Sequence, residues 1–296
     1  MWELSLVRLV VGAVFLFVAS LKDLRSRRVP DELWILMGII AMGVLGAELL
    51  FVKEVTWEYF LFFVPIGVVF LEAFIDRPPV YSEGKVNPLV LGWLFVPILV
   101  FIYLIGVLDG SLLFWSLTMI LVVMLFSFIL YFFYILHGGA DAKAVITLAI
   151  LLPFYPNIPG LTHRAISAEV VTGMEVFFPF TMVILLNSSL IMLIFPIANS
   201  IFNLYSGDVD VPKMFFGYKK RVDELEGSFV WPMQYYEDGQ LKTELLPKSD
   251  SAERISSLKN HDMKTVWVTP KIPFIVPILI GFVISFLIGN PLLHLI

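Results

Sequence analysis

Two aspartates stand where a long apolar run meets a short polar stretch. Asp141 lies in LHGGADAK, between the runs SLLFWSLTMILVVMLFSFILYFFYIL and AVITLAILLPFY. Asp23 lies in SLKDLRSRRVPDELW, at the end of the first apolar run. A charged side chain is costly at a membrane unless it is hydrated or paired, so an ionisable residue in such a place is a candidate for function. We predict that Asp23 and Asp141 are catalytic.

Paired carboxylates support one well-defined chemistry. Two carboxylates at short range share a proton, because ionising both side by side costs free energy through charge repulsion. The ionised group can then act as a general base on water while the protonated group polarises a carbonyl. This chemistry requires no metal or cofactor, and we expect none. The chain has no cysteine, which excludes a thiol nucleophile, a disulfide and a Cys-ligated centre, and its four histidines are widely scattered.

The residues before Asp141 are small. We assign Gly138, Gly139 and Ala140 to an active-site loop, because glycine adopts backbone angles that other residues avoid and lets a substrate or a helix come close. His137 could tune Asp141, although a histidine at a membrane border is more often simply hydrated or hydrogen-bonded.

Simpler interpretations stay open for the same aspartates. Asp141 could cap a helix, where a carboxylate meets free backbone N–H groups. Asp23 could pair with Lys22 or Arg27 in a solvated loop. Asp31 is expected to cap the second apolar segment. Four further acidic residues lie near the ends of apolar runs and are expected to be interfacial: Glu48, Glu72, Asp76 and Asp109.

The elements that position these residues are expected to be membrane helices. The chain has 296 residues, of which 59% are hydrophobic and only 15% charged, and its mean hydropathy is +0.89. A soluble domain is nearer half apolar and a quarter charged. A spanning helix needs about 20 residues. This predicts an all-α polytopic membrane protein with about eight spans: 4–21, 33–52, 58–75, 88–107, 111–136, 142–156, 174–204 and 273–295.

Two of these spans are irregular, and the first could be mistaken for a signal peptide. The sixth is short and is limited by Pro153, and the seventh contains Asn187-Ser188-Ser189 near its middle, so it could kink or form two pieces. In the first, the basic cluster follows the apolar run instead of preceding it. We therefore expect the first run to be retained as a span.

Lysine and arginine predict the orientation. If the N-terminus is outside, 17 of the 20 basic residues fall in cytoplasmic segments. The long segment 205–272 obeys this rule weakly, but the bias remains without it. We therefore expect a multi-pass protein of the cell membrane with Asp23 and Asp141 at its cytoplasmic face.

The segment 205–272 is the only sizeable polar part of the chain. Asp238-Gly239 stands between strand-like residues in YYEDGQLKTEL, which predicts a β-hairpin. We expect a small β-rich cytosolic segment that is flexible and loop-like near 248–264. This divides the chain into a transmembrane catalytic domain at 1–204, a soluble segment at 205–272 and a last helix at 273–296. The formal charge of −5 does not favour nucleic-acid binding.

Taken together, the motifs resemble those of a known family. The sequence is similar to the prepilin and preflagellin peptidases, the GxGD aspartic proteases of membranes, and most of all to their archaeal branch. The family pattern D-x-x-x-R-x-(I/V)-(P/E)-D reads here Asp23, Arg27, Val29, Pro30 and Asp31. The GxGD motif reads Gly138 to Asp141, with Ala140 in place of a strict glycine. Two further matches are FFGYK from Phe215 and WVTPKIPFIVPI up to Ile278.

The resemblance implies a function and a partner. It implies an aspartic endopeptidase that removes the short basic leader from preflagellin (archaellin) or from type IV prepilin-like precursors at the cytoplasmic face. It also implies six family-like spans, so the segment 58–107 is interpreted as an extra helix pair. The partners would be these precursors and the lipid bilayer.

Three other functions remain open. A GxGD protease of the presenilin or signal-peptide-peptidase kind would cut within a transmembrane helix, but the Tyr-Asp and Pro-Ala-Leu elements of those enzymes are absent from the sequence. An ion-coupled transporter could use the same two aspartates as ligands, although transporters usually place such charges near the middle of the bilayer. A scaffold that binds a cytosolic partner through 205–272 is the third possibility.

Overall fold

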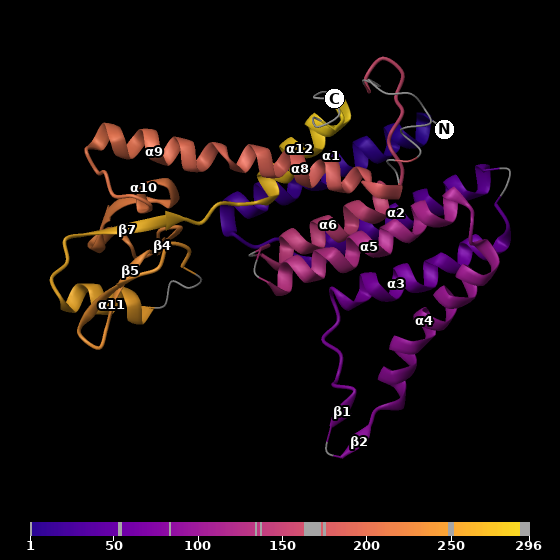
Figure 1. Cartoon of the computed structure of the whole chain (residues 1–296), viewed down its shortest axis with the longest axis horizontal. Coiled ribbons are helices and arrows are strands. Elements are labelled where there is room, and N and C mark those ends of the chain that lie inside the picture. Colours follow the sequence, from indigo (N-terminus) through magenta and orange to yellow (C-terminus); the bar gives the residue numbers. More distant parts are fainter. Residues whose placement is uncertain are drawn as a thin grey trace. The chain divides into compact units, whose positions relative to one another are not determined.

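The chain folds into two compact units. The computed structural model describes residues 2–52, 55–82, 84–133, 135–136, 138–162, 173, 176–247 and 252–290. Residues 1–188 and 273–296 form the first, called here the helical unit, and residues 189–272 form the second, called the sheet unit. The described chain is mostly helical with a small β segment before the last helix, as the sequence predicts (Figure 1).

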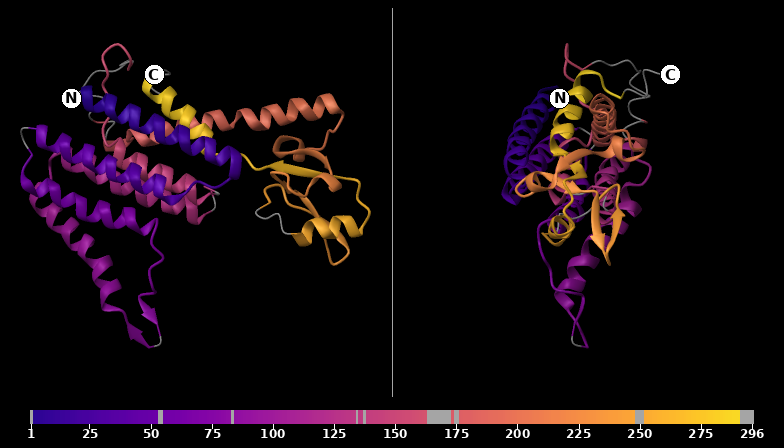
Figure 2. Two further views of the ribbon diagram at one scale, coloured as in Figure 1. Left: turned by 180° about the vertical axis from the view of Figure 1, so that it is seen from behind. Right: turned by 90° about the vertical axis from the view of Figure 1, so that its left-hand side faces the viewer.

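The helical unit contains these elements: α1 Trp2–Ser26, α2 Asp31–Phe51, the 3₁₀ helix η1 Trp57–Phe62, α3 Phe63–Glu72, β1 Tyr81–Ser82, β2 Lys85–Val86, α4 Pro88–Leu108, α5 Leu112–Phe132, α6 Gly139–Leu151, the first part of α8 Phe180–Met192, and α12 Ile275–Leu287. Strands β1 and β2 form a short antiparallel hairpin between α3 and α4. In both views of Figure 2 this hairpin lies at the bottom, where the chain passes from α3 into α4.

Length and hydropathy support a membrane-spanning protein, but fewer spans than the sequence predicts. Within the described residues, five helices are long and apolar enough to cross a membrane: Trp2–Ser26, Asp31–Phe51, Pro88–Leu108, Leu112–Phe132 and Phe180–Ser206. The other three predicted spans hold shorter helices, so their crossing stays a prediction. α3 begins after a 3₁₀ turn, α6 ends two residues before Pro153, and α12 ends two residues before Gly289, whose φ is +80°.

The predicted irregularity of the seventh span is confirmed, at a different residue. Helix α8 ends at Met192, and α9, Ile194–Ser206, begins after Leu193. Pro196 has no backbone N–H to donate to the carbonyl of Met192, which accounts for a break at this point. The polar residues Asn187 and Ser188 lie inside α8 instead, and Asn187 donates a hydrogen bond to Ser285 Oγ of α12 at 2.7 Å.

Helix α6 occupies the centre of the helical unit. It packs against α1, α2, α3, α5 and α12, and α1 lies beside α12 in both ribbon views (Figures 1 and 2). Every residue from Asp141 to Leu151 is buried except Lys143, which is half-buried. A helix that is apolar on all sides is typical of such an enclosed position. The short helix that carries Asp141 is therefore held by neighbours on every side.

The segment interpreted as an extra pair packs tightly onto the rest of the helical unit. A Cβ atom built on Gly38 of α2 would stand only 2.2 Å from the ring of Phe70 on α3. A similar approach joins α1 to α12, where a Cβ on Gly12 would stand 2.4 Å from Phe282. Both glycines act through their small size, because each opens a notch that an aromatic ring fills.

The sheet unit contains the rest of α8 followed by these elements: α9, α10 Lys213–Phe216, β3 Tyr218–Arg221, η2 Val222–Glu224, β4 Val230–Pro232, β5 Gln234–Glu237, β6 Gln240–Thr243, α11 Ala252–Asn260 and β7 Thr265–Pro270. Strand β7 lies between β3 and β4, antiparallel to both, with Tyr218 opposite Val268 and Trp231 opposite Thr269.

One local prediction in the sheet unit is confirmed and another is wrong. Strands β5 and β6 form the predicted hairpin, with Asp238 and Gly239 at its turn at φ +52° and +73°. The loop expected near 248–264 instead contains helix α11 at Ala252–Asn260, while residues 248–251 lie outside the described residues. Its Leu258 is fully buried in a small core with Val266 and Val268, so burial of that side chain stabilises a helix whose mostly polar sequence suggests a loop.

Candidate active site

Asp23 and Asp141 are each carried by the end of a helix. Asp23 lies in the last turn of α1 and is half-buried, and its carbonyl accepts a hydrogen bond from the Arg27 backbone N–H at 2.9 Å. Arg27 adopts φ +54° just after the helix ends at Ser26. Asp141 is the third residue of α6, and only 8% of its surface is exposed.

The helical unit brings these two aspartates together. The carboxylate of Asp23 lies close enough to that of Asp141 for direct charge–charge repulsion. The elements responsible are α1 and α6, which pack against each other and against α12. Segments far apart in the sequence thus place two like charges at one end of the helical unit, within range of each other's electrostatic effect.

Two helix N-termini face this pair. The Asp23 carboxylate accepts a hydrogen bond from the backbone N–H of Ile275, the first residue of α12, and the Asp141 carboxylate accepts one from Gly138, the N-cap of α6. Ser20, one turn before Asp23, donates to the carbonyl of Ile275 at 3.4 Å. Free N–H groups and the positive end of a helix dipole both stabilise an anion. Capping and catalysis are therefore compatible roles for Asp141.

The glycines before Asp141 act through space and not through unusual backbone angles. Gly138 has φ −108°, and Gly139 is not among the residues with positive φ, so the expectation of special backbone angles is wrong for both. A Cβ on Gly138 would stand 2.8 Å from Asp141 Oδ2, because that side chain folds back over residue 138. Gly139 has room, since its nearest atom is the Tyr131 hydroxyl at 4.0 Å. Ala140 is half-buried.

Lys143 and Asp31 form an ion pair that the sequence pattern does not predict. Lys143 Nζ donates to Asp31 Oδ1 at 2.6 Å, and it lies 5.0 Å from the centroid of the Phe74 ring at the end of α3. Asp31 does not cap α2 as expected. The N-cap is Pro30, without a side-chain hydrogen bond, and Asp31 is the first helical residue. Both residues belong to motifs quoted in the sequence analysis, and that membership is the sequence signal by which the ion pair could have been found.

Three further sequence predictions concern His137, a metal site and Glu48. His137 lies outside the described residues. Among the part of the chain that is described, no group of three or more histidine, aspartate or glutamate side chains could hold a metal ion. Glu48 is not interfacial as expected, because it is 7% exposed and its carboxylate accepts a hydrogen bond from Arg8 Nη2.

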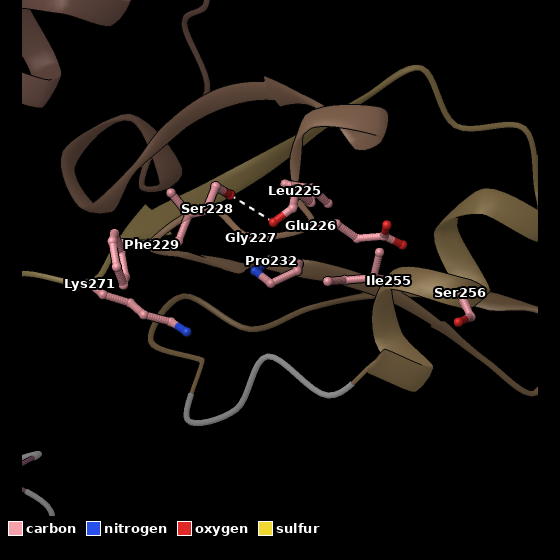
Figure 3. A pocket seen from close by; sticks show the side chains of 10 residues that line it. Leu225, Glu226, Gly227, Ser228, Phe229, Pro232, Ile255, Ser256 and Lys271 are labelled. Atoms are coloured by element: carbon pink, nitrogen blue, oxygen red, sulfur yellow. Dashed lines mark hydrogen bonds between the residues drawn. The ribbon is translucent and has the colours of Figure 1, made fainter. Parts of the chain in front are cut away.

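The sheet unit has a cavity of about 480 Å³ that contains none of the predicted site residues (Figure 3). Two of its polar side chains, Ser228 and Glu226, are engaged within the unit itself. The Ser228 hydroxyl donates to the Leu225 carbonyl at 2.8 Å, and the Glu226 carboxylate pairs with Lys259 at 2.5 Å. Among the described residues that line the cavity, the side chains are therefore not grouped as a hydrolytic site would require.

Comparison with known proteins shows what this chain is similar to. Residues 210–290 match the family model described as "Archaeal Peptidase A24 C-terminus Type II". The chain is 24% identical to the preflagellin peptidase of Methanocaldococcus jannaschii, over 97% of this chain and 96% of that protein. It is 22% identical to the preflagellin peptidase of Methanococcus maripaludis over 97% of each chain. The resemblance to archaeal preflagellin peptidases is confirmed.

A third relative and the position of the family match agree with this. The preflagellin peptidase of Methanococcus voltae is 21% identical over 98% of this chain and 99% of its own length. The matched range contains both later motifs, FFGYK from Phe215 and WVTPKIPFIVPI up to Ile278. It therefore includes Ile275, whose N–H faces Asp23. Each of the three relatives is named as a peptidase, while the assignment of Asp23 and Asp141 as catalytic remains a prediction.

Proposed function

We propose that this protein is a membrane aspartic endopeptidase that removes the leader peptide from preflagellin or type IV prepilin-like precursors at the cytoplasmic face. The observation that carries the proposal is the approach of Asp23 and Asp141 from two distant segments, beside two helix N-termini. The names of the three relatives support the substrate class.

The proposed mechanism uses one proton shared between the two carboxylates. The ionised carboxylate removes a proton from a water molecule as its oxygen attacks the carbonyl carbon of the scissile peptide bond. The protonated carboxylate donates its proton to the carbonyl oxygen, which gives a tetrahedral diol. A proton then passes to the leaving nitrogen and the C–N bond breaks. The products are a free carboxyl group and a free amine, and the pair returns to its singly protonated state.

The geometry is compatible with one carboxylate acting as the general base and the other as the general acid. The N–H groups of Ile275 and Gly138 can hold a carboxylate in position while leaving its other lone pairs available for water or substrate. The burial of Asp141 keeps bulk water from competing for its hydrogen bonds, which strengthens electrostatic effects inside the site.

The test is cleavage of a co-expressed preflagellin by variants of the full chain. Asp23→Asn and Asp141→Asn should each abolish cleavage, because an amide can neither take the proton from water nor share it, while the protein stays in the membrane at its normal level. Asp76→Asn is the matched control, since Asp76 is an exposed aspartate in the loop after α3. Cleavage at the normal rate by either site variant would overturn the assignment.

The position of the cut separates this proposal from its alternatives. N-terminal sequencing of the product should place the cut between the basic leader and the apolar helix. A cut near the middle of the helix would favour an intramembrane protease with other substrates. Gradient-driven ion uptake by proteoliposomes, lost in both aspartate variants, would favour a transporter.

A further inference from the structure

Helix α9 in the sheet unit exposes apolar side chains along one face. The members of this set are each 46–94% exposed and recur at helical spacing. We call them the α9 stripe: Leu190 at the end of α8, then Ile194, Ile197, Ile201, Leu204 and Tyr205. Exposed singly, such residues are ordinary, but a contiguous face of this kind marks a surface that something else covers.

The opposite face of α9 is polar and is turned toward its own unit. Asn203 is fully buried, and its Nδ2 donates to the carbonyls of Met214 at 2.9 Å and Gly217 at 2.6 Å. Asn199 donates to the carbonyl of Phe215 at 3.4 Å. In Figure 1, α9 lies alongside α10, which provides two of these three carbonyls. This is the reverse of a water-soluble helix, which turns its apolar face inward.

The chain that leads into α9 indicates what covers the stripe. Residues Phe180–Ser206 together form one candidate membrane span of 27 residues, and the stripe begins on its α8 part with Leu190. At 1.5 Å per residue this segment is about 40 Å long, whereas the hydrocarbon core of a bilayer is about 30 Å thick. The C-terminal part of the segment therefore extends past the hydrocarbon even if its N-terminal part crosses.

A full crossing by α9 is also excluded by its polar face. Lipid cannot surround a helix whose buried Asn203 is bonded to the backbone of a polar unit. A helix with one apolar face and one polar face instead lies in the plane of the membrane interface, with the apolar face immersed by about 5–10 Å. Tyr205, at the C-terminal end of the stripe, is of the residue type enriched at that level.

We propose that the α9 stripe is a lipid-binding surface, with which the sheet unit rests on the membrane. The occupant is the acyl-chain and headgroup boundary of the bilayer. Helix α9 then lies in the interface, its apolar residues toward the lipid and its asparagines toward α10 and β3. The inference rests on the segment Phe180–Ser206 and on the contacts of α9 within the sheet unit, and it does not depend on the proposed peptidase activity.

The absence of cysteine from the chain makes a direct test practical. The full-length protein is reconstituted into phosphatidylcholine–phosphatidylglycerol vesicles with a nitroxide label on one introduced cysteine, at Ile197→Cys or Ile201→Cys. Leu99→Cys on α4, at an exposed apolar position of a candidate span, gives the lipid reference, and Gln240→Cys, in the β5–β6 hairpin, gives the water reference. Ser206→Cys, also exposed, is the control on the polar side of α9 itself.

The measurement is the accessibility of each label to dissolved oxygen, which concentrates in lipid, relative to a water-soluble nickel chelate. The ratio at residues 197 and 201 should resemble that at Leu99→Cys and exceed that at Ser206→Cys by about tenfold, as for a helix with one immersed face. Both labels must behave alike, because they lie on the same face one turn apart.

Three results would overturn the proposal. If the nickel chelate reaches residues 197 and 201 as readily as residue 240, the stripe faces water. If both reagents are excluded and dipolar broadening disappears on dilution with unlabelled protein, a second copy of the chain covers the stripe. If both reagents are excluded without broadening, the stripe is covered by protein of another kind.

Discussion

The two ends of α1 carry buried charges in opposite arrangements. Near its start, the side chains of Arg8 and Glu48 are 3% and 9% exposed and form an ion pair between α1 and α2. Near its end, Asp23 faces Asp141, a residue of the same charge. The 15 residues from Arg8 to Asp23 correspond to about 22 Å along a helix, so the two clusters are well separated.

The difference indicates which cluster is structural. An ion pair that is buried and hydrogen-bonded is costly to break, and the guanidinium of Arg8 also lies over the Phe154 ring at 5.8 Å, so the first cluster fixes how α1 and α2 meet. Two carboxylates placed together are unfavourable by themselves. Such an arrangement persists where function requires it, often at the expense of stability. The comparison therefore predicts opposite effects of neutralising charge at the two ends.

The largest expected effect is at the Arg8 end. Arg8→Met should lower the free energy of unfolding by about 3–5 kcal/mol, because it leaves the Glu48 carboxylate buried without its partner. Arg8→Met combined with Glu48→Leu should recover most of that loss. Denaturation in detergent micelles, followed by circular dichroism, gives both values.

The same measurement on Asp141→Asn tests the other half of the comparison. Removal of a like charge should leave the unfolding midpoint unchanged or raise it. If Asp141→Asn were as destabilising as Arg8→Met, the two ends would both be structural, and the functional interpretation of the aspartate pair would lose its support.

A smaller effect is expected from the residue that lies under the Asp141 carboxylate. In Gly138→Ala the added Cβ would stand 2.8 Å from Asp141 Oδ2, so the carboxylate must turn away from its present position. We expect cleavage of preflagellin to slow by about 10- to 100-fold, as for other displacements of reacting groups by less than an ångström or two. The rate is measured under single-turnover conditions.

Gly139→Ala is the matched control for this change. The nearest atom to its added Cβ would be the Tyr131 hydroxyl at 4.0 Å, an ordinary contact distance, so its rate should stay close to normal. Equal losses in the two variants would mean that the loop tolerates no side chain at all, and that the contact with Asp141 is not the cause.

The two clusters differ in how far the sequence predicts them. Asp23 and Asp141 are found because each interrupts an apolar run, and the cost of a charge there is visible locally. The pair of Arg8 and Glu48 is missed because its members are 40 residues apart, and each alone looks like an interfacial residue. Pairing across helices is set by packing, which hydropathy and spacing do not report.

The same contrast between local patterns and long-range packing explains which other structural features the sequence predicts. The Asp238-Gly239 hairpin is local, since two adjacent residues with positive φ determine it, and its prediction is confirmed. Helix α11 depends on the burial of Leu258 against strand β7, which no local pattern reveals. The N–H of Ile275 reaches Asp23 from the far end of the chain, and a backbone group carries no sequence signal.

The smallest expected effect concerns the ion pair beside the aspartates. Lys143 and Asp31 are 20% and 47% exposed at their side chains, so their pair should contribute at most about 1 kcal/mol to stability. Lys143 is two residues from Asp141 along α6, and a cation that lies near a carboxylate favours its ionised form. In Lys143→Met we expect cleavage to slow by a few fold and to begin at a higher pH, since the ionised carboxylate loses that support.

Asp31→Asn separates charge from packing at this site. It breaks the same 2.6 Å contact between α2 and α6 but leaves the cation of Lys143 in place, now without its carboxylate partner. If charge is what links Lys143 to the aspartate pair, the pH at which cleavage begins should not rise in this variant, and Lys143→Arg should behave almost normally. The measurement is the pH–rate profile of each variant. An equal rise in the pH at which cleavage begins, in both Lys143→Met and Asp31→Asn, would show instead that the ion pair acts by holding the start of α6 against α2. The aspartate site would then depend on a structural ion pair, as the Arg8 end of α1 does.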